Sequence, residues 1–127
     1  MGIAFTIRDP FGTVTDVRGR VGFGGASVVL ELDGRGAARG VERKVVIDVE
    51  EFVSCSFRRG MLGARMHLWA LEEGALGGVP GAGHHGVTLQ FARDDRDAAE
   101  ALADRVNLAI GEAAARVIVR DELALRA

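Results

Sequence analysis

The chain has 127 residues, of which 48% are hydrophobic and 27% are charged, and its formal net charge is −2. This length suits a single domain that buries a core without metal or disulfide staples, and the composition excludes a disordered chain. The first 66 residues carry a charge of +2 and the remaining 61 carry −4, so no basic stripe favours nucleic-acid binding. Cys55 is the only cysteine. With no signal peptide or spanning segment in the pattern, we expect a cytoplasmic protein.

Strand patterns fill about the first ninety residues, separated by glycine turns. Residues 2–8 have the pattern of a short edge strand or a loose arm. The later segments alternate apolar and polar residues, or lie between turn signals, as strands do. These predicted strands are residues 13–23, 26–33, 44–49, 53–59, 62–71 and 87–93.

The alternation also predicts which side chains face the core. In the fourth of these strands the inward residues are Val53, Cys55 and Phe57, which makes Cys55 a buried, unreactive thiol. In the fifth strand the inward face runs from Leu62 to Ala70 at every second residue. The other face of that strand carries Arg65, His67 and Trp69.

From about Asp94 the apolar period changes from two to 3.6, which predicts a terminal helix. Aspartates at its start favour the positive end of the helix dipole. The apolar stripe of this helix is Ala99, Leu102, Val106, Ala109, Ile110, Ala113 and Val117. Beyond Ala115, apolar side chains lie on several sides of the predicted helix. They are Val117, Ile118, Val119, Leu123 and Leu125. Such a segment either frays or docks on another chain.

The order of strands and helix resembles the bacterial pleckstrin-homology-like (PH-like) domains. The resemblance rests on the hairpin at residues 17–32, on the stretch 44–57, and on residues 87–91 just before the helix. It implies a mainly β fold with one C-terminal α-helix: an antiparallel barrel or sandwich of about seven strands capped by the helix. Residues 1–127 would form a single PH-like domain, with strands at about 3–93 and the helix at about 95–120.

Domains of this superfold bind phosphoinositides, peptides or partner proteins, so the resemblance alone does not assign a function. Arg18 and Arg20 supply positive charge on the first strand of the hairpin, but Glu31 and Asp33 occupy the second. Because that carboxylate pair would repel phosphate, phosphoinositide binding at this hairpin is not expected.

Candidate catalytic and metal-binding residues do not converge. The G-x-G-x-x-G spacing at residues 81–86 precedes a strand rather than a helix, so it predicts a loop and not a dinucleotide site. His84 and His85 lack convergent partners, because Cys55 faces the core and His67 faces away from it. We therefore expect no cofactor, no metal and no enzymatic activity.

Two surface groups could bind a partner. Arg58-Arg59, near Arg65, form either an anion patch at a strand end or merely solvated arginines. Arg65, His67 and Trp69 form a row that could anchor a protein, unless the strand bends and turns Trp69 into the core.

The sequence favours a non-enzymatic protein-interaction or oligomerisation module, most simply a homo-oligomer. Its interface would use the apolar end of the helix, including Val117, Ile118 and Leu123, or an open strand edge. The alternative is a barrel that binds a small hydrophobic ligand or lipid. That alternative predicts a cavity of ~300 Å³ or more, lined by Phe23, Phe57, Met66 and Phe91.

Overall fold

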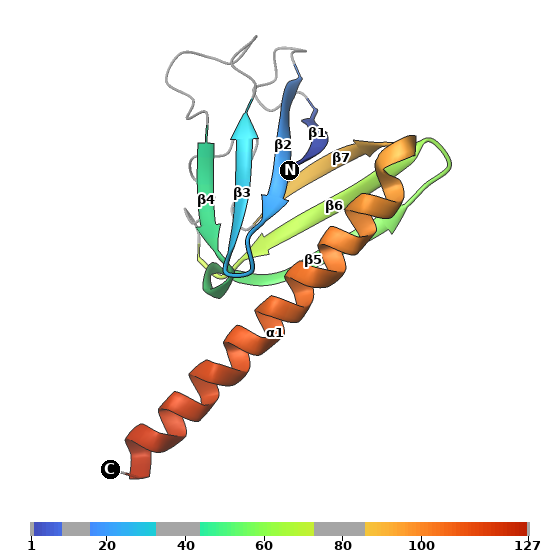
Figure 1. The fold of residues 1–127 in the computed structure, drawn as a ribbon. Coiled ribbons are helices and arrows are strands. Elements are labelled where there is room, and N and C mark those ends of the chain that lie inside the picture. The colour runs from blue at the N-terminus through green and yellow to red at the C-terminus, as the bar shows by residue number, and fades with distance from the viewer. Residues whose placement is uncertain (1, 9–15, 33–43, 73–85, 127) are drawn as a thin grey trace.

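The computed structural model describes residues 2–8, 16–32, 44–72 and 86–126, and these form seven strands, two short 3-10 helices and one long α-helix. In chain order the elements are β1 (Ile3–Ile7), β2 (Val17–Phe23), β3 (Ser27–Leu32), β4 (Lys44–Asp48), η1 (Val49–Glu51), β5 (Phe52–Arg59), β6 (Gly63–Ala70), β7 (Gly86–Ala92), η2 (Arg93–Asp95) and α1 (Arg96–Arg126). The predicted mainly β fold with one C-terminal helix is confirmed (Figure 1).

All seven strands belong to one antiparallel sheet in the order β4-β3-β2-β1-β7-β6-β5. The prediction that residues 2–8 form an edge strand or a loose arm is wrong, because β1 occupies the middle of the sheet. Its pairing with β2 runs from Ile3 opposite Val21 to Ile7 opposite Val17. Its other neighbour is β7, so β1 joins the two halves of the sheet.

The sheet bends strongly at this joint but does not close into a barrel. Between β1 and β7 the register consists of Thr6 opposite Gln90, so the two halves diverge from there (Figure 1). The edge strands are β4 and β5, which are consecutive in the chain and connected by η1. The helix packs against β5, η1 and β6, and covers this open side of the sheet.

The core lies between the concave face of the sheet and the first half of α1. Inward side chains alternate along the strands as predicted: Val28, Leu30 and Leu32 of β3 are buried, and so are Val87, Leu89 and Phe91 of β7. The largest side chains that are almost completely buried are Leu30, Ile47, Met66, Leu68, Leu89 and Leu102. Alternating strands and one helical stripe therefore enclose a single hydrophobic core.

In the strands, two residues predicted to face the core are exposed instead. The β5–β6 register passes from Phe52 opposite Ala70 to Ser54 opposite Trp69, so Val53 is an extra residue in a β-bulge. The bulge interrupts the alternation, and Phe52 takes the buried position while the Val53 side chain is 53% exposed. Leu62 lies in the turn before β6 rather than in the strand.

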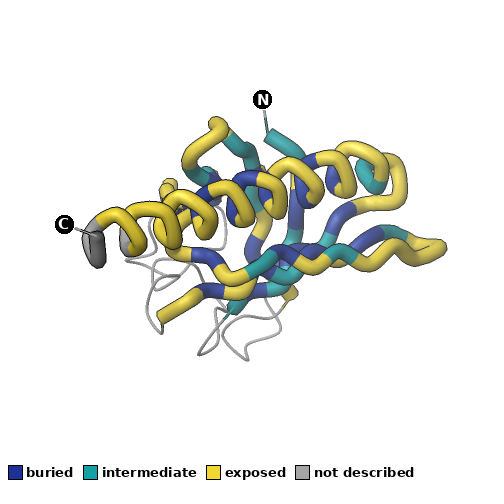
Figure 2. Tube along the Cα trace, turned by 90° about the horizontal axis from the view of Figure 1, so that it is seen from below, coloured by how far each residue is buried: buried dark blue, intermediate teal, exposed yellow. Residues whose placement is uncertain are grey.

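The helix stripe is buried only as far as Ala113. Val117 was predicted to continue the stripe, but it is 42% exposed because α1 has by then run past the edge of the sheet. Figure 2 shows this change along the helix, which runs to Arg126 rather than to the expected end near residue 120. Within the part of the chain that the structure describes, no helix is long and apolar enough to cross a membrane.

Candidate functional site

The outward face of β6 carries the predicted row of Arg65, His67 and Trp69. The side chains between them in the strand, Met66 and Leu68, point into the core, so the row stands on the opposite face of the sheet from α1. The Trp69 side chain remains 43% exposed, and its ring centroid lies 4.0 Å from that of His67. Trp69 is therefore a surface residue rather than a core residue.

His67 is held in place by its neighbours on the same face. Its Nδ1 lies 2.7 Å from the Thr88 hydroxyl oxygen on β7. The imidazole covers Gly86, where any Cβ would meet the His67 ring and the Leu68 carbonyl. Burial lowers the pKa of His67, and its Nε2 has no hydrogen-bond partner among the described residues. These contacts favour a neutral ring that packs against Trp69.

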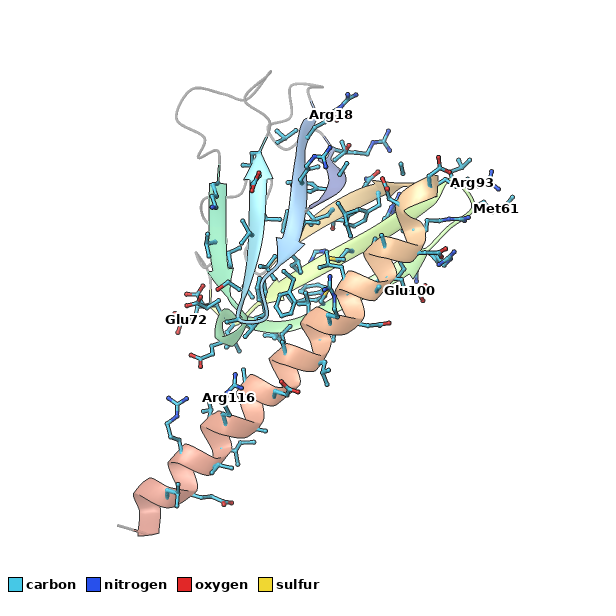
Figure 3. The ribbon with its side chains drawn as sticks, viewed as in Figure 1. Arg18, Met61, Glu72, Arg93, Glu100 and Arg116 are labelled. Atoms are coloured by element: carbon cyan, nitrogen blue, oxygen red, sulfur yellow. The ribbon has the colours of Figure 1, made fainter. Side chains whose placement is uncertain are left out.

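The tip of the β5–β6 hairpin, residues 60–63, exposes two apolar side chains. A tight turn forms because the Gly60 N–H donates to the Gly63 carbonyl at 2.8 Å. The two central residues, Met61 and Leu62, are 86% and 91% exposed. The hairpin tip is thus a small apolar projection, and Figure 3 shows Met61 at the outer end of the hairpin.

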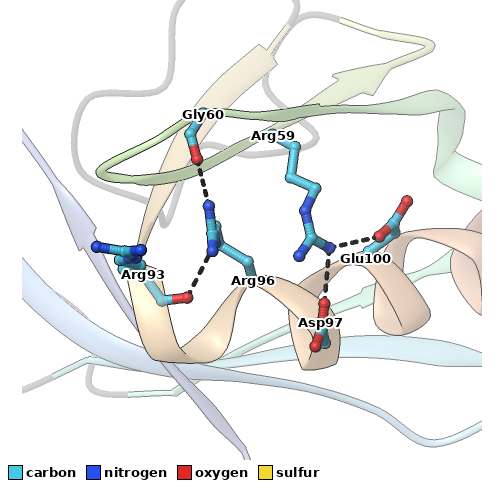
Figure 4. A network of polar contacts seen from close by, with 6 residues as sticks. All are labelled: Arg59, Gly60, Arg93, Arg96, Asp97 and Glu100. Atoms are coloured by element: carbon cyan, nitrogen blue, oxygen red, sulfur yellow. Dashed lines mark hydrogen bonds and ion pairs between the residues drawn. The ribbon is translucent and has the colours of Figure 1, made fainter.

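Arginine contacts fix the hairpin tip to the start of the helix (Figure 4). Arg96 donates from Nη1 to the Gly60 carbonyl at 2.7 Å and from Nε to the Arg93 carbonyl at 3.1 Å. Arg59 Nη1 lies 2.7 Å from Asp97 Oδ1 and 2.8 Å from Glu100 Oε2. The single positive charge of Arg59 is thus shared by two carboxylates, so it offsets half of their negative charge and holds both beside the tip.

A groove of about 520 Å³ lies at the hairpin tip, and its lining combines four arginines with the residues of the tip and Phe91. Arg58 and Arg65 face each other directly across the β5–β6 pair, and Arg8 and Gln90 extend the lining beyond them. Among the described residues, Arg8, Arg58 and Arg65 have no carboxylate partner, whereas Arg59 is already paired. The structure therefore brings Arg58, Arg59 and Arg65 close together, as predicted. Within this cluster, Arg58 and Arg65 are the arginines without a carboxylate partner among the described residues.

The far end of α1 forms a second exposed surface. We define the helix end as Val117, Ile118, Val119 and Leu123, whose side chains are 42%, 61%, 54% and 61% exposed. Figure 3 shows Arg116, at its start, beyond the sheet. The structure does not bring this surface together with the row of Arg65, His67 and Trp69, because α1 packs on the other face of β6.

Cys55 is buried, as predicted. Burial, together with the negative charge of Asp104, raises the pKa of its thiol to about 12. Such a thiol carries almost no thiolate at neutral pH and is a poor nucleophile. The described residues contain no group of three or more histidine, cysteine or acidic side chains arranged for a metal, and His84 and His85 lie outside the described residues.

Several of these positions were not predicted from the sequence, among them the exposed hairpin tip and the contact of Asn107 with β5. Leu62 was assigned to a strand and Met61 to a turn, although Gly60 and Gly63 on either side are the signature of a short hairpin loop. Asn107 reaches the backbone of Cys55, a residue 52 positions away, and no local pattern could reveal that contact. Its position on the helix indicated only that it lies off the buried stripe.

No protein-family model matches this chain, and a search of curated proteins finds no significant match. The fold and the surfaces of the chain itself therefore carry the functional argument.

Proposed function

We propose that this protein is a protein-association module with a PH-like fold of the bacterial type, and that it assembles with copies of itself through the helix end. The arrangement of seven antiparallel strands and a C-terminal helix is consistent with that fold in general. The exposure of four apolar side chains on the length of helix beyond the buried stripe is the observation that carries the proposal. We place the module in the cytoplasm, in keeping with its single, free cysteine.

The helix is longer than the sheet can support. Its 31 residues span about 46 Å, and the last buried residue of its stripe is Ala113. Beyond Ala113 an exposed ion pair of 3.9 Å joins Arg120 to Glu50 of η1, which is weak support. A helical segment with so little tertiary contact is only marginally stable in water, and β-branched residues such as Val117 and Ile118 lower its propensity further. A partner that covers the helix end would supply the missing contacts.

Burial of the helix end would give a substantial gain. Complete burial of a fully exposed Val, Leu or Ile side chain contributes about 1.5–3 kcal/mol. The four residues of the helix end are 42–61% exposed, so each would gain a part of that amount. Val117 continues the buried stripe beyond Ala113, whereas Val119 and Leu123 are one helical turn apart on a different side. The apolar surface therefore extends around the helix, as expected of a segment that packs between chains.

The edge strands are less suitable for self-association. The β5 edge is occupied where Asn107 of α1 binds the backbone of Cys55. The β4 edge strand has five residues and carries Lys44 and Asp48 at its ends, and short, charged edge strands resist pairing. These features favour the helix end over an edge-to-edge contact.

The test is the mass of the particle in solution, measured by light scattering over a range of protein concentrations. We expect the unmodified chain to form an oligomer, and Ile118→Asp to shift it to the monomer without loss of the folded sheet. The matched control is Leu108→Asp, because Leu108 is 66% exposed on the supported half of the same helix. A strict monomer at high concentration, or equal dissociation by both variants, would refute the proposal.

A further inference from the structure

We propose that the hairpin tip docks on an anionic phospholipid surface. In this arrangement Met61 and Leu62 enter the interfacial layer of the bilayer, and Arg8, Arg58 and Arg65 contact lipid phosphates. The inference is independent of the proposed self-association, because it uses a different end of the molecule.

The first support is the shape of the hairpin tip. Met61 and Leu62 are the two most exposed large hydrophobic residues described, and they stand on a turn at the rim of the groove. The tip is also braced, since Arg96 holds the Gly60 carbonyl and Arg59 holds Asp97 and Glu100. A braced apolar projection can enter a lipid interface without first having to become ordered.

The second support is the charge immediately behind the tip. Arg58 and Arg65 lie directly opposite each other, and like charges in that position repel. An anion between them would relieve the repulsion, and guanidinium groups match phosphate oxygens in a bidentate manner. Arg8 lines the same groove, and Gln90, opposite Arg65 on β7, adds a neutral amide donor. Anionic headgroups attract clustered arginines in this way.

The combination favours a lipid surface over other anionic partners. Met61, Leu62 and the arginines line one groove, so the ligand must offer both an apolar phase and an anionic group. Single-stranded nucleic acid would need an aromatic platform beside the charges. Trp69, the exposed aromatic residue of this sheet face, lies four residues along β6 from Arg65, about 13 Å away.

The geometry also leaves the helix end free. Arg96, at the first turn of α1, contacts the hairpin, and Val117 lies 21 residues later, about 32 Å along the helix axis. A chain docked by its hairpin tip would therefore hold the helix end away from the membrane. Lipid docking and self-association can then take place on the same chain.

The experiment is co-sedimentation of the full chain with vesicles of phosphatidylcholine, either alone or mixed with phosphatidylserine. We expect binding to the mixed vesicles that weakens as salt is added. Arg58→Ser and Arg65→Ser should each weaken it about fivefold, and Leu62→Ser about tenfold. Matched controls are Arg105→Ser and Leu108→Ser, which change exposed residues on α1 far from the tip, and circular dichroism verifies the fold of every variant.

Further measurements distinguish a lipid phosphate from other anions, and they distinguish lipid docking from self-association. Inorganic phosphate and single-stranded DNA are tested on the same variants. The assignment to a lipid surface is overturned if either of them binds through Arg58 and Arg65 while vesicles do not bind. Equal binding to neutral and anionic vesicles, or an unchanged affinity in Leu62→Ser, would overturn it as well. Ile118→Asp should keep its vesicle binding and Leu62→Ser should keep its oligomeric mass, so the failure of one proposal does not imply failure of the other.

Discussion

The side-chain amide of Asn107 on α1 pairs with the backbone of Cys55 on β5 as a neighbouring strand would. Asn107 Oδ1 accepts from the Cys55 N–H at 2.9 Å, and Asn107 Nδ2 donates to the Cys55 carbonyl at 2.5 Å. Because β5 is an edge strand, these two backbone groups have no partner within the sheet. Asn107 thus forms hydrogen bonds with the outward N–H and carbonyl of Cys55 on β5, and this contact fixes the position of α1 along the strand.

Replacement of Asn107 tests this contact. Asn107→Ala should lower the free energy of unfolding by about 1–2 kcal/mol, because both Cys55 backbone groups lose their partner and water replaces it only in part. Urea unfolding measures the change. The control is Leu108→Ala at the next, exposed position, where we expect about 0.5 kcal/mol or less. Equal effects in the two variants would show that the amide contact contributes nothing specific.

Two glycines should respond to alanine in opposite directions. At Gly63 a Cβ would collide with the Phe91 carbonyl of the neighbouring strand, so Gly63→Ala should destabilise by about 2 kcal/mol or more. At Gly111, in the middle of α1, a Cβ would meet nothing within 4 Å. Gly111→Ala should therefore stabilise by about 0.5–1 kcal/mol through helix propensity. Thermal unfolding of both variants checks the signs, and two changes of the same sign would contradict the packing described.

The raised pKa of Cys55 predicts a loss of stability at alkaline pH. In the folded chain the thiol ionises at about 12 instead of its ordinary 9.0. Above about pH 9 the unfolded chain loses this proton and the folded chain keeps it, so stability is full below that value and falls as pH rises toward about 12. The slope should approach about 1.4 kcal/mol per pH unit.

The chain suits this measurement, because it contains no tyrosine and its single lysine is Lys44. Urea unfolding should be compared at neutral pH and about one unit above pH 9. Cys55→Val, which keeps an apolar side chain in the core, should lack most of the alkaline slope. If the slope persists in that variant, another group must be responsible.

Local periodicity predicted the existence and order of the strands and the helix, although several of their ends differ in the structure. In β3 and β7 the apolar residues alternate with polar ones because one face of each strand is buried. The structure places both sets in the core: Val28, Leu30 and Leu32 of β3, and Val87, Leu89 and Phe91 of β7. Periodicity wrongly predicted that Val53 faces the core. A β-bulge depends on how a strand pairs with its neighbour, and the sequence of one strand does not determine that pairing.

Long-range arrangement could not be read in the same way. Residues 2–8 give no sign that β1 pairs with the distant β7 as well as with β2, the next strand in the chain. The row of Arg65, His67 and Trp69 was found because strand residues two apart share a face, and the apolar helix end was found by composition. The groove was only partly foreseen, since Arg8 joins Arg58 and Arg65 through the fold rather than through sequence proximity.

The proposal that copies of this chain cover the helix end is tested most directly by hydrogen–deuterium exchange of residues 116–123. A helix without tertiary contacts opens readily, so its amides exchange almost as fast as in an unfolded chain. We predict that these amides in the unmodified protein are protected, that protection falls on dilution, and that Ile118→Asp abolishes it while amides of β6 stay protected. Rapid exchange across residues 116–123 at every concentration, with no difference in Ile118→Asp, would contradict the account.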